Sequence, residues 1–509
     1  RQGEDIGVEI LLNNGSGTMT EYTQYNLPDR NRGFVHLADF DNNGALDIYF
    51  SGGDFGNQIS RIYYNSNGVL NQKPSAPQNL SATANNDGSI SINWTASTDA
   101  ETPSNALTYN IWMKESLTSS NYLAPPQADT SNGFRMIPNF GTGSINTSYR
   151  YEPKRPLCSA TSYYIAIQAV DHVYAGGDFS DVIPFSISAD TTFLVHVDTD
   201  ARGLNDGSSW FNAFTDLRDA ALISPSGCPS KEIWVAEGTY IPSADSIRVN
   251  TFFMNNNNTR LIGGFKGNEK DPEERKPEQY TTILSGDIGV VGLETDNSYS
   301  IFNIPGDDIY IDGFTIQDGY ANNTSQTIWR TGAGAYISGD NVHFNRCIFK
   351  DHLAPNNGVG AAIINYGNST TLENCLIFNN HASGNGGAIS SESGLVNIIN
   401  STITKNTANN GGGVHLFNGN VEINSSILAF NQGNNANIND GGGGGSATLS
   451  HSLLSSALPP NVIDGLGNIF NADPMFQDTS VANYKLLYGS PAINSGMDAA
   501  NSFDVDLDG

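Results

Sequence analysis

Short apolar runs alternate with Gly/Asn turns along the C-terminal part of the chain, with a regular period. A pair of small residues opens each copy of the pattern about 26 residues after the previous one: Gly334-Ala335, Gly360-Ala361, Gly387-Ala388 and Gly413-Val414. A second apolar run follows in each copy, at Asn345-Arg-Cys-Ile-Phe, Asn374-Cys-Leu-Ile-Phe, Asn400-Ser-Thr-Ile-Thr and Asn424-Ser-Ser-Ile-Leu. One copy cannot bury its own apolar face, so the copies must stack. The pattern therefore predicts a right-handed parallel β-helix.

The β-helix is expected to occupy residues 192–509, with about ten coils and a helix over its first coil. Strand-like runs that precede the regular copies, such as Ile233-Trp-Val-Ala, supply the earlier coils. The expected helix would be capped by Ser208 or Ser209. It would cover the unpaired backbone and the apolar core at the end of the stack. Its apolar face has the helical spacing 4, 3 and 4 and consists of Trp210, Phe214, Leu217 and Ala221.

A second fold is predicted between residues 74 and 190. The prolines of Lys73-Pro-Ser-Ala-Pro77 stiffen the chain and deny it sheet pairing, which marks a boundary. Strands with period-2 alternation follow, which is typical of a β-sandwich. Through the strand of Trp94 and the position of Tyr163, this segment resembles a fibronectin type III domain, and its core would contain Tyr163, Ile165, Ile167 and Ala169. An aromatic insertion at about 115–150 either binds a partner or folds over the sandwich, and we favour the second.

Residues 1–70 contain an acidic loop between two alternating strands. Counted along the loop, the side chains at positions 1, 3, 5 and 9 are those of Asp39, Asp41, Asn43 and Asp47. Position 7 would contribute a backbone carbonyl near Ala45. Hard Ca²⁺ favours such oxygen ligands, and Gly44 permits the sharp turn. Because strands flank the loop, it resembles the FG-GAP or VCBS blade of a calcium-binding β-propeller. The alternative is an Asx-rich turn without metal. A single blade cannot close a ring, so any further blades would lie upstream.

The third segment also resembles a known family. The runs Glu232-Ile-Trp-Val-Ala-Glu-Gly-Thr-Tyr240, Thr282-Ile-Leu-Ser-Gly-Asp287 and Gly489-Ser-Pro-Ala-Ile-Asn494 are similar to the choice-of-anchor class of bacterial pectin-lyase-like β-helix domains. The resemblance covers roughly residues 192–509. It implies a bacterial protein that is secreted or held at the cell surface by a further C-terminal sorting region. The expected fold class is thus all-β, with a partial propeller, a sandwich and a β-helix.

Charge and cysteine content narrow the classes of partner. The net charge is −28, which argues against nucleic acid and anionic membrane surfaces, because both require a basic footprint. No apolar run is long enough to span a bilayer. The pairing of Cys158 with Cys228 cannot be judged from sequence. Alignment of Ile348 with Ile377 would place Cys347 and Cys375 one residue out of step, on opposite faces.

The candidate chemistry on the β-helix is sparse. In the same alignment His352 lies beside His381 on adjacent coils, close to Lys350 and Lys405. A neighbouring column would hold Asp351, Asn380 and Asn406, with Asn431 one residue out of step. Two stacked histidines are a weak candidate for a catalytic pair and are more often simply solvated. An Asn column has a structural role, since such ladders hydrogen-bond along a stack.

The sequence therefore favours a non-catalytic, secreted surface protein that uses the β-helix for adhesion or glycan binding. The first alternative is a polysaccharide lyase or glycoside hydrolase with its site on the β-helix flank. The second is exported cargo that binds a secretion apparatus through a region outside this chain. Fold alone does not separate binding from cleavage.

Overall fold

The computed structural model of the protein describes residues 11–13, 18–21, 34–38, 40–41, 43, 45–54, 57–66, 71–85, 89–118, 122–137, 139–142, 145–153, 157–158, 162–187, 192–223 and 228–497. The chain forms two compact units, residues 1–153 with 159–189, and residues 154–158 with 190–509. The expected division into three domains stays a prediction, since the first two predicted domains lie in one unit. Among the described residues, no helix is long and apolar enough to cross a membrane.

Antiparallel hairpins form the start of the first unit. Strand β1 (Leu11–Asn13) pairs with β2 (Met19–Glu21). A separate sheet contains β3 (Phe34–Ala38), β4 (Asp47–Asp54) and β5 (Asn57–Tyr63) in that order. Residues 39–46 connect β3 to β4, so the acidic loop lies between two strands, as its alternating flanks predict.

A two-sheet sandwich follows in the first unit. One sheet has the order β10 (Ser148–Tyr151), β7 (Ile90–Thr95) and β6 (Gln78–Ala84). The other has the order β12 (Gly176–Phe179), β11 (Ser162–Val170), β8 (Thr108–Lys114) and β9 (Tyr122–Ala124), and β13 (Ile183–Ser186) also pairs with β11. Trp94 of the first sheet meets Tyr109 of the second, with ring centroids 4.9 Å apart. The predicted core residues of β11 are all buried, namely Tyr163, Ile165, Ile167 and Ala169.

The insertion near residues 115–150 folds over the sandwich, as expected. Its anchor is Gln168 of β11, which is fully buried and donates to the Gly133 carbonyl over 2.6 Å. Asn110 of β8 donates to Gln168 over 3.0 Å and accepts a hydrogen bond from the backbone of Gln127. These contacts explain why Gln168, on the outer face of β11, is buried.

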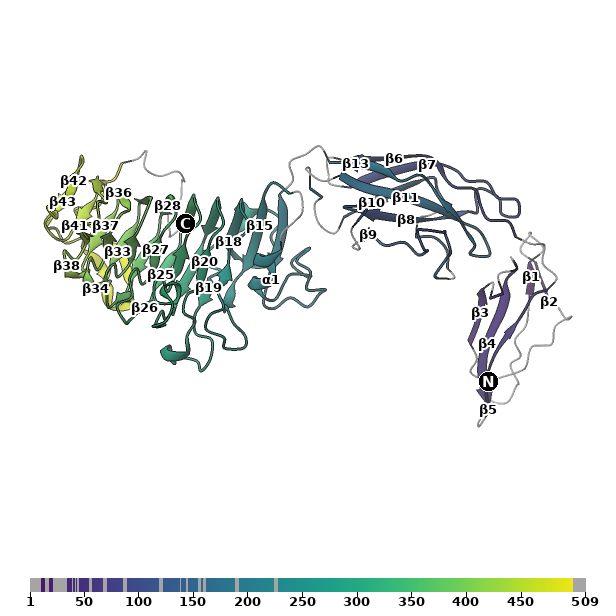
Figure 1. The fold of residues 1–509 in the computed structure, drawn as a ribbon, viewed down its shortest axis with the longest axis horizontal. Coiled ribbons are helices and arrows are strands. Elements are labelled where there is room, and N and C mark those ends of the chain that lie inside the picture. The colour runs from purple at the N-terminus through teal and green to yellow at the C-terminus, as the bar shows by residue number, and fades with distance from the viewer. Residues whose placement is uncertain are drawn as a thin grey trace. The chain divides into compact units, whose positions relative to one another are not determined.

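Parallel strands stack into a β-helix in the second unit (Figure 1). The ten-strand sheet contains β14 (Phe193–Val197), β15 (Lys231–Ala236), β18 (Thr259–Phe265), β21 (Ile309–Asp312), β24 (Val342–Asn345), β28 (Ser369–Glu373), β32 (Leu395–Ile399), β36 (Asn420–Asn424), β40 (Ala447–Ser450) and β42 (Val462–Asp464). The nine-strand sheet contains β16 (Gly238–Tyr240), β19 (Thr282–Ser285), β22 (Phe314–Gln317), β25 (Ile348–Lys350), β29 (Leu376–Phe378), β33 (Thr402–Thr404), β37 (Ile427–Ala429), β41 (Leu453–Leu454) and β43 (Ile469–Phe470).

Two further parallel sheets complete the coils. The seven-strand sheet contains β17 (Phe252–Phe253), β20 (Phe302–Ile304), β23 (Ala335–Ile337), β27 (Ile363–Asn365), β31 (Ile389–Ser391), β35 (Val414–Leu416) and β39 (Ile438–Asp440). The four-strand sheet contains β26 (Leu353–Ala354), β30 (His381–Ala382), β34 (Thr407–Asn410) and β38 (Gln432–Asn434). Short 3-10 helices lie in the connections: η1 (Pro272–Glu274), η2 (Glu294–Asp296), η3 (Thr327–Trp329) and η4 (Thr479–Val481). The ten levels agree with the number of coils predicted from the repeat.

The inward-facing side chains form continuous apolar ladders. In the ten-strand sheet the ladder is fully buried from Val195 to Leu449 and includes Ile233, Leu261, Ile311, Phe344, Leu372, Ile398 and Ile423. Since each strand places one such residue over the previous one, the coils stabilise each other by burying apolar surface.

The register between coils differs from the predicted one. Ile348 pairs with Leu376, and not with Ile377, because Arg346 and Asn374 occupy the same turn position with φ of 47° and 53°. In the seven-strand sheet, Ala335 pairs with Ile363, which moves the Gly360-Ala361 pair out of the expected alignment. The connections differ in length, so counting between small-residue pairs misplaces the strands by one or two residues.

The capping helix is shorter than predicted. Helix α1 (Leu217–Leu222) begins after Asp216, whose side chain accepts the Arg218 backbone N–H, rather than after Ser208 or Ser209. Trp210 lies outside the helix and packs against Phe265, with ring centroids 5.4 Å apart. Leu217 and two alanines of α1 are buried against the first coils, so the helix still covers the end of the core.

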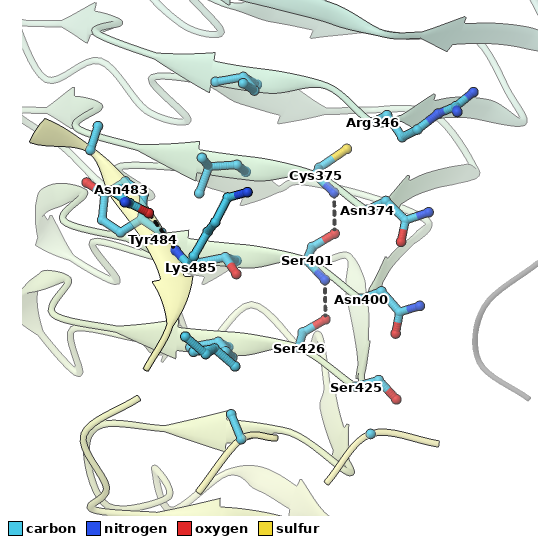
Figure 2. A pocket seen from close by; sticks show the side chains of 18 of the residues that line it. Arg346, Asn374, Cys375, Asn400, Ser401, Ser425, Ser426, Asn483, Tyr484 and Lys485 are labelled. Carbon is cyan, nitrogen blue, oxygen red and sulfur yellow. Dashed lines mark hydrogen bonds between the residues drawn. The ribbon is translucent and has the colours of Figure 1, made fainter. Parts of the chain in front are cut away.

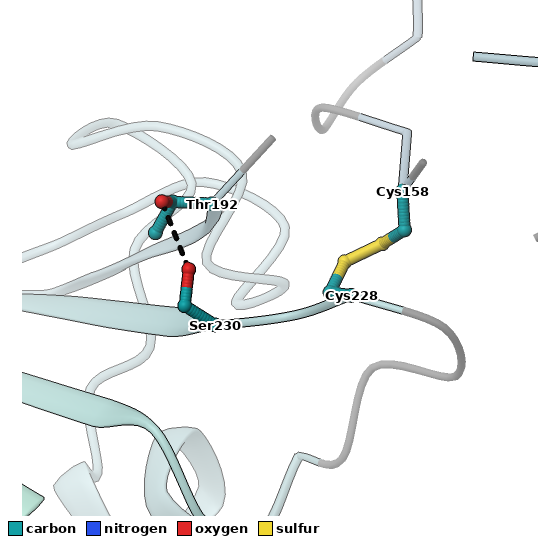
Figure 3. Close-up of a disulfide and its surroundings, with 4 residues drawn as sticks. All are labelled: Cys158, Thr192, Cys228 and Ser230. Atoms are coloured by element: carbon teal, nitrogen blue, oxygen red, sulfur yellow. Dashed lines mark hydrogen bonds between the residues drawn. A yellow bond between two sulfur atoms is a disulfide. The ribbon is translucent and has the colours of Figure 1, made fainter. Parts of the chain in front are cut away.

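A disulfide joins Cys158 to Cys228 and closes a separation of 70 residues (Figure 3). Cys158 is buried and belongs to the apolar core of the β-helix. Residues 145–153 and 162–187, which are the described stretches before and after residues 157–158, belong to the first unit. Cys347 and Cys375 are free, buried and level with each other, because Ile348 pairs with Leu376. The predicted one-residue offset of these two thiols is therefore wrong.

Candidate functional site

The acidic loop holds its side chains by hydrogen bonds within the first unit. Asp47 is fully buried, and its carboxylate accepts the backbone N–H groups of Phe40 at 2.7 Å and Asn65 at 2.8 Å. Asn43 donates to the Asp41 carboxylate over 3.0 Å and accepts the Ala45 N–H. Asp39 lies outside the described residues. Two of the predicted ligands, Asp41 and Asn43, are therefore adjacent, while the Asp47 carboxylate already accepts hydrogen bonds from the backbone around the hairpin.

The oxygen donors of this loop are of the type that calcium prefers. Every predicted ligand offers oxygen, and the exposed Asp41 carboxylate is directed toward Asn43. In the part of the chain that is described, no three His, Cys, Asp or Glu side chains are grouped as a metal site would require. An ion here would need Asn43 and backbone carbonyls in addition to carboxylates. Calcium binding stays a prediction.

The two predicted histidines do not share a site. His381 pairs with Leu353, and side chains alternate between faces along a strand, so His381 is exposed while His352 is fully buried. The Lys350 ammonium lies 3.4 Å from the Asp351 carboxylate, and Lys405 donates to the Thr479 carbonyl over 2.6 Å. The two residues do lie on adjacent coils, where the His381 N–H donates to the His352 carbonyl over 2.8 Å. The expected stacking of their side chains is wrong, because the alignment was shifted by one residue.

His352 instead heads a buried ladder of amide side chains. The backbone N–H of His352 donates to Asn380 Oδ1, Asn380 to Asn406 Oδ1, and Asn406 to Asn431 Oδ1, each over 3.0 Å. Asp351 belongs to a different column, where Asn379 donates to it. The ladder thus contains Asn431 and excludes Asp351, the reverse of the predicted column.

The imidazole of His352 has the hydrogen-bonding pattern of an asparagine amide. Nδ1 accepts the Gly319 N–H at 3.1 Å, and Nε2 lies 3.0 Å from the Ile316 carbonyl, to which it donates as the neutral tautomer. Burial lowers the pKa of His352 to about 3. This group is therefore neutral, enclosed and structural, and it offers no accessible base.

A groove crosses the outer face of the nine-strand sheet (Figure 2). It has a volume of about 970 Å³. One side chain from each of six successive strands lies in register along it: Thr315, Ile348, Leu376, Thr402, Ile427 and Leu453. A second row comes from the turns before five of these strands, all with positive φ: Arg346, Asn374, Asn400, Ser425 and His451.

The turn row stays fixed because a buried hydroxyl ladder lies behind it. Ser401 Oγ accepts the backbone N–H of Cys375, and Ser426 Oγ accepts that of Ser401, each at 3.0 Å (Figure 2). Ser452 continues the ladder in the next coil. Asn374, Asn400 and Ser425 are each followed by a residue whose backbone N–H is bound to the next coil, which keeps the spacing from coil to coil constant.

A C-terminal hairpin forms the second wall of the groove. It consists of β44 (Phe476–Asp478) and β45 (Asn483–Leu486), and Tyr484 packs between Phe378 and Phe476 with both ring centroids 5.2 Å away. Further along the chain, the backbone of Met497 donates to Ser425 Oγ over 2.9 Å. These contacts hold the C-terminal segment against the sheet and give the groove its depth.

The charged group at one end of the groove is neutralised from behind. Arg346 donates to both oxygens of Asp312, at 3.0 and 2.7 Å, and Arg275 binds the same carboxylate. Burial alone would raise the pKa of Asp312, but the two guanidinium groups hold it below its usual value. Burial opposes ionisation of Arg346 as well, yet Asp312 raises the pKa of Arg346. Arg346 is therefore a permanent cation that is already paired.

The groove was not predicted from the sequence. In the correct register the turn row could have been found, because Asn374, Asn400 and Ser425 are residue types that favour turns. The wall could not, since nothing local in residues 476–486 indicates which coils they contact.

Comparisons with known proteins find a family model that matches the first residues and solved structures that are similar to the chain. A family described as FG-GAP-like repeat matches residues 3–50. No curated protein matches the chain. Among solved structures, the chain is similar to a family 28 exopolygalacturonase from Yersinia enterocolitica, with 12% identity, a TM-score of 0.24 and coverage of 77% of this chain and 76% of that one. It is also similar to a pectate lyase from Pectobacterium carotovorum, with 8% identity, a TM-score of 0.15 and coverage of 78% and 92%.

Proposed function

We propose that this chain is part of a secreted or cell-surface protein that binds a polysaccharide along the groove of its β-helix without cleaving it. The observation that carries the proposal is the pair of in-register rows that cross successive coils within one groove. Adjacent coils are about 4.8 Å apart, so the groove offers the same kind of contact at a constant interval. A polysaccharide, which repeats its own unit along an extended chain, suits such a surface.

The chemistry of the two rows fits sugar rings. In the turn row, the half-buried Asn400 amide can donate to and accept from sugar hydroxyls, and the Ser425 hydroxyl, which accepts the Met497 N–H, can still donate. Ile348 and Ile427 of the strand row are half-buried and offer apolar surface to the C–H faces of the rings. A ligand in the groove would therefore be held by many modest contacts distributed over its length.

The groove lacks the groups that usually cleave polysaccharides. Of its lining residues, all of which are described, Glu278 is the single carboxylic acid, whereas most glycoside hydrolases use two. A lyase needs a base, and Arg346 is held protonated by Asp312. The other possible bases of the lining, His451 and Lys485, lie at the far end of the turn row and on the hairpin wall, away from the Arg346 end. These features favour binding over catalysis at this surface. A site elsewhere on the flank, as in the lyase or hydrolase alternative, is an outcome of the test below.

The other segments support an extracytoplasmic location. A disulfide between Cys158 and Cys228 is typical of proteins that fold in an oxidising compartment. The FG-GAP-like repeat and the oxygen donors of Asp41 and Asn43 support a calcium ion that stabilises the first hairpin. The strand orders of the sandwich agree with a fibronectin type III spacer. Attachment to a surface or to secretion machinery would depend on regions outside this chain.

The proposal is tested by measuring retention and product together. The full chain is passed through gels that contain neutral or acidic polysaccharides, with and without Ca²⁺, and the same polysaccharides are then assayed for new reducing ends and unsaturated products. Retention without product is expected. The variant Thr402→Trp fills the middle of the groove and should abolish retention, while Asn397→Trp adds the same ring to the same coil on the ten-strand sheet and should not. Product from the wild type, or equal retention of both variants, would overturn the proposal.

A further inference from the structure

We infer that the groove selects a polysaccharide whose backbone carries no charge, rather than a polyuronate. This inference rests on the proposed function of the groove and names its ligand class. A polyuronate carries a carboxylate on each sugar, so a matching site needs cations at the interval of the repeat. The turn row has this interval and supplies one position per coil.

The turn row does not supply a cation in every coil, because its two basic residues, Arg346 and His451, lie only at its ends. Asn374, Asn400 and Ser425 occupy its three central positions, and all three side chains are uncharged. Arg346, at one end of the row, already donates hydrogen bonds to Asp312 from its Nε and one terminal nitrogen. A carboxylate bound along the central positions would lose its hydration and receive no compensating charge.

The strand row points to the same ligand class. Leu376, Thr402 and Ile427 present methyl groups and one hydroxyl in consecutive coils, and no charged residue interrupts them. The chain as a whole has a net charge of −28, which repels a polyanion at low ionic strength. Lys485 is the single cation among the groove-lining residues of the hairpin wall, so that wall does not supply one positive charge per coil either. The groove therefore matches a neutral chain in both its spacing and its polarity.

Pairs of polysaccharides that share a backbone and differ in the charge of their substituents test this inference. The full chain is titrated with hydroxyethyl cellulose against carboxymethyl cellulose, and with methyl-esterified polygalacturonan against polygalacturonate, at low and high NaCl. The neutral member of at least one pair should bind about tenfold or more tightly, with an affinity that salt does not change. Thr402→Trp should weaken this binding by a similar factor, and Asn397→Trp should leave it unchanged.

The outcomes separate this inference from the proposed function. Salt-sensitive binding of the acidic members that Thr402→Trp abolishes would keep glycan binding at the groove and overturn the preference for a neutral chain. Binding that Thr402→Trp does not weaken would overturn both the proposed function and the preference for a neutral chain. The absence of binding to every member of a broad panel of neutral and acidic chains would overturn both as well. Circular dichroism and thermal melting of each variant show whether a loss of binding reflects a loss of fold.

Discussion

Replacement of His352 by asparagine should make the β-helix less sensitive to acid. The buried imidazole uses one nitrogen to accept from Gly319 and the other to donate to Ile316, which an amide can also do. Asn380, Asn406 and Asn431 already occupy the equivalent position in the next three coils. His352→Asn therefore extends the ladder by one coil, whereas His352→Ala leaves a buried donor and a buried acceptor without partners, at about 1–3 kcal/mol each.

The magnitude follows from the shift in the pKa of His352. Its ordinary value is 6.5, and burial lowers it to about 3 in the folded protein. Between these values the unfolded chain binds a proton that the folded chain does not, so the free energy of unfolding falls as the pH falls through this window. For the wild type the loss from this group is about 2 kcal/mol between pH 7 and pH 5, and about 4–5 kcal/mol once the pH is below 3. His352→Asn removes this contribution.

The free thiols of Cys347 and Cys375 report on the same coils. Both are buried, so they react with a thiol reagent only after the surrounding coils open. Urea unfolding is followed by dithiodipyridine labelling, which works at both pH 7 and pH 5. His381→Asn, in the neighbouring coil and exposed, controls for the loss of a histidine. Equal pH dependence of the wild type and His352→Asn would refute the assignment of His352 as a neutral member of the ladder.

Three further changes test other parts of the structure. Cys228→Ser removes a disulfide that spans 70 residues and should lower the free energy of unfolding of the second unit by roughly 4 kcal/mol by the loop-closure model. Chemical unfolding of the wild type with and without reductant should give the same difference. An unchanged unfolding midpoint would contradict the pairing. Asp312→Asn leaves two largely enclosed arginines, whose side chains are 10% and 13% exposed, without their shared carboxylate. The change should cost about 3–5 kcal/mol in thermal or urea unfolding, and Glu278→Gln in the same groove is the near-neutral control. Calcium should raise the melting temperature of the first unit in the wild type but not in Asp41→Ala, and an equal rise in both would exclude the acidic loop as the calcium site.

The architecture could be predicted because it repeats. Each coil carries the same signal of apolar strands between Gly/Asn turns, and the sandwich strands show clear period-2 alternation. The acidic loop was placed correctly between β3 and β4 because its flanks alternate in the same way. These features are local, so a single sequence contains them.

The register could not be predicted from apolar residues alone. Leu376, Ile377 and Phe378 are three apolar residues in succession, so either of two alignments with Ile348 places an apolar side chain inside. The decisive feature is the turn residue with positive φ, which is Asn374 in one coil and Arg346 in the coil before it. Arginine seldom adopts this conformation, and this hid the equivalence. An alignment error of one residue was enough to predict a histidine pair from His352, which is a buried member of the amide ladder.

The capping helix and the groove show two other limits. The spacing of Trp210 with Leu217 suits a helix, but the Asp216 side chain starts the helix later, and Trp210 packs with aromatic residues outside it. The wall of the groove depends on Tyr484 reaching Phe378, a contact across a hundred residues that no local pattern encodes.

Hydrogen–deuterium exchange of the full chain, with and without a retained polysaccharide, tests the central claim most directly. If the ligand lies in the groove, exchange should slow in peptides that contain the turn row from Asn374 to Ser425 and in the hairpin β44–β45. The insertion over the sandwich, around Gly133, should exchange at the same rate in both samples. Protection at the insertion, or on the ten-strand sheet alone, would contradict the assignment of the groove as the binding surface.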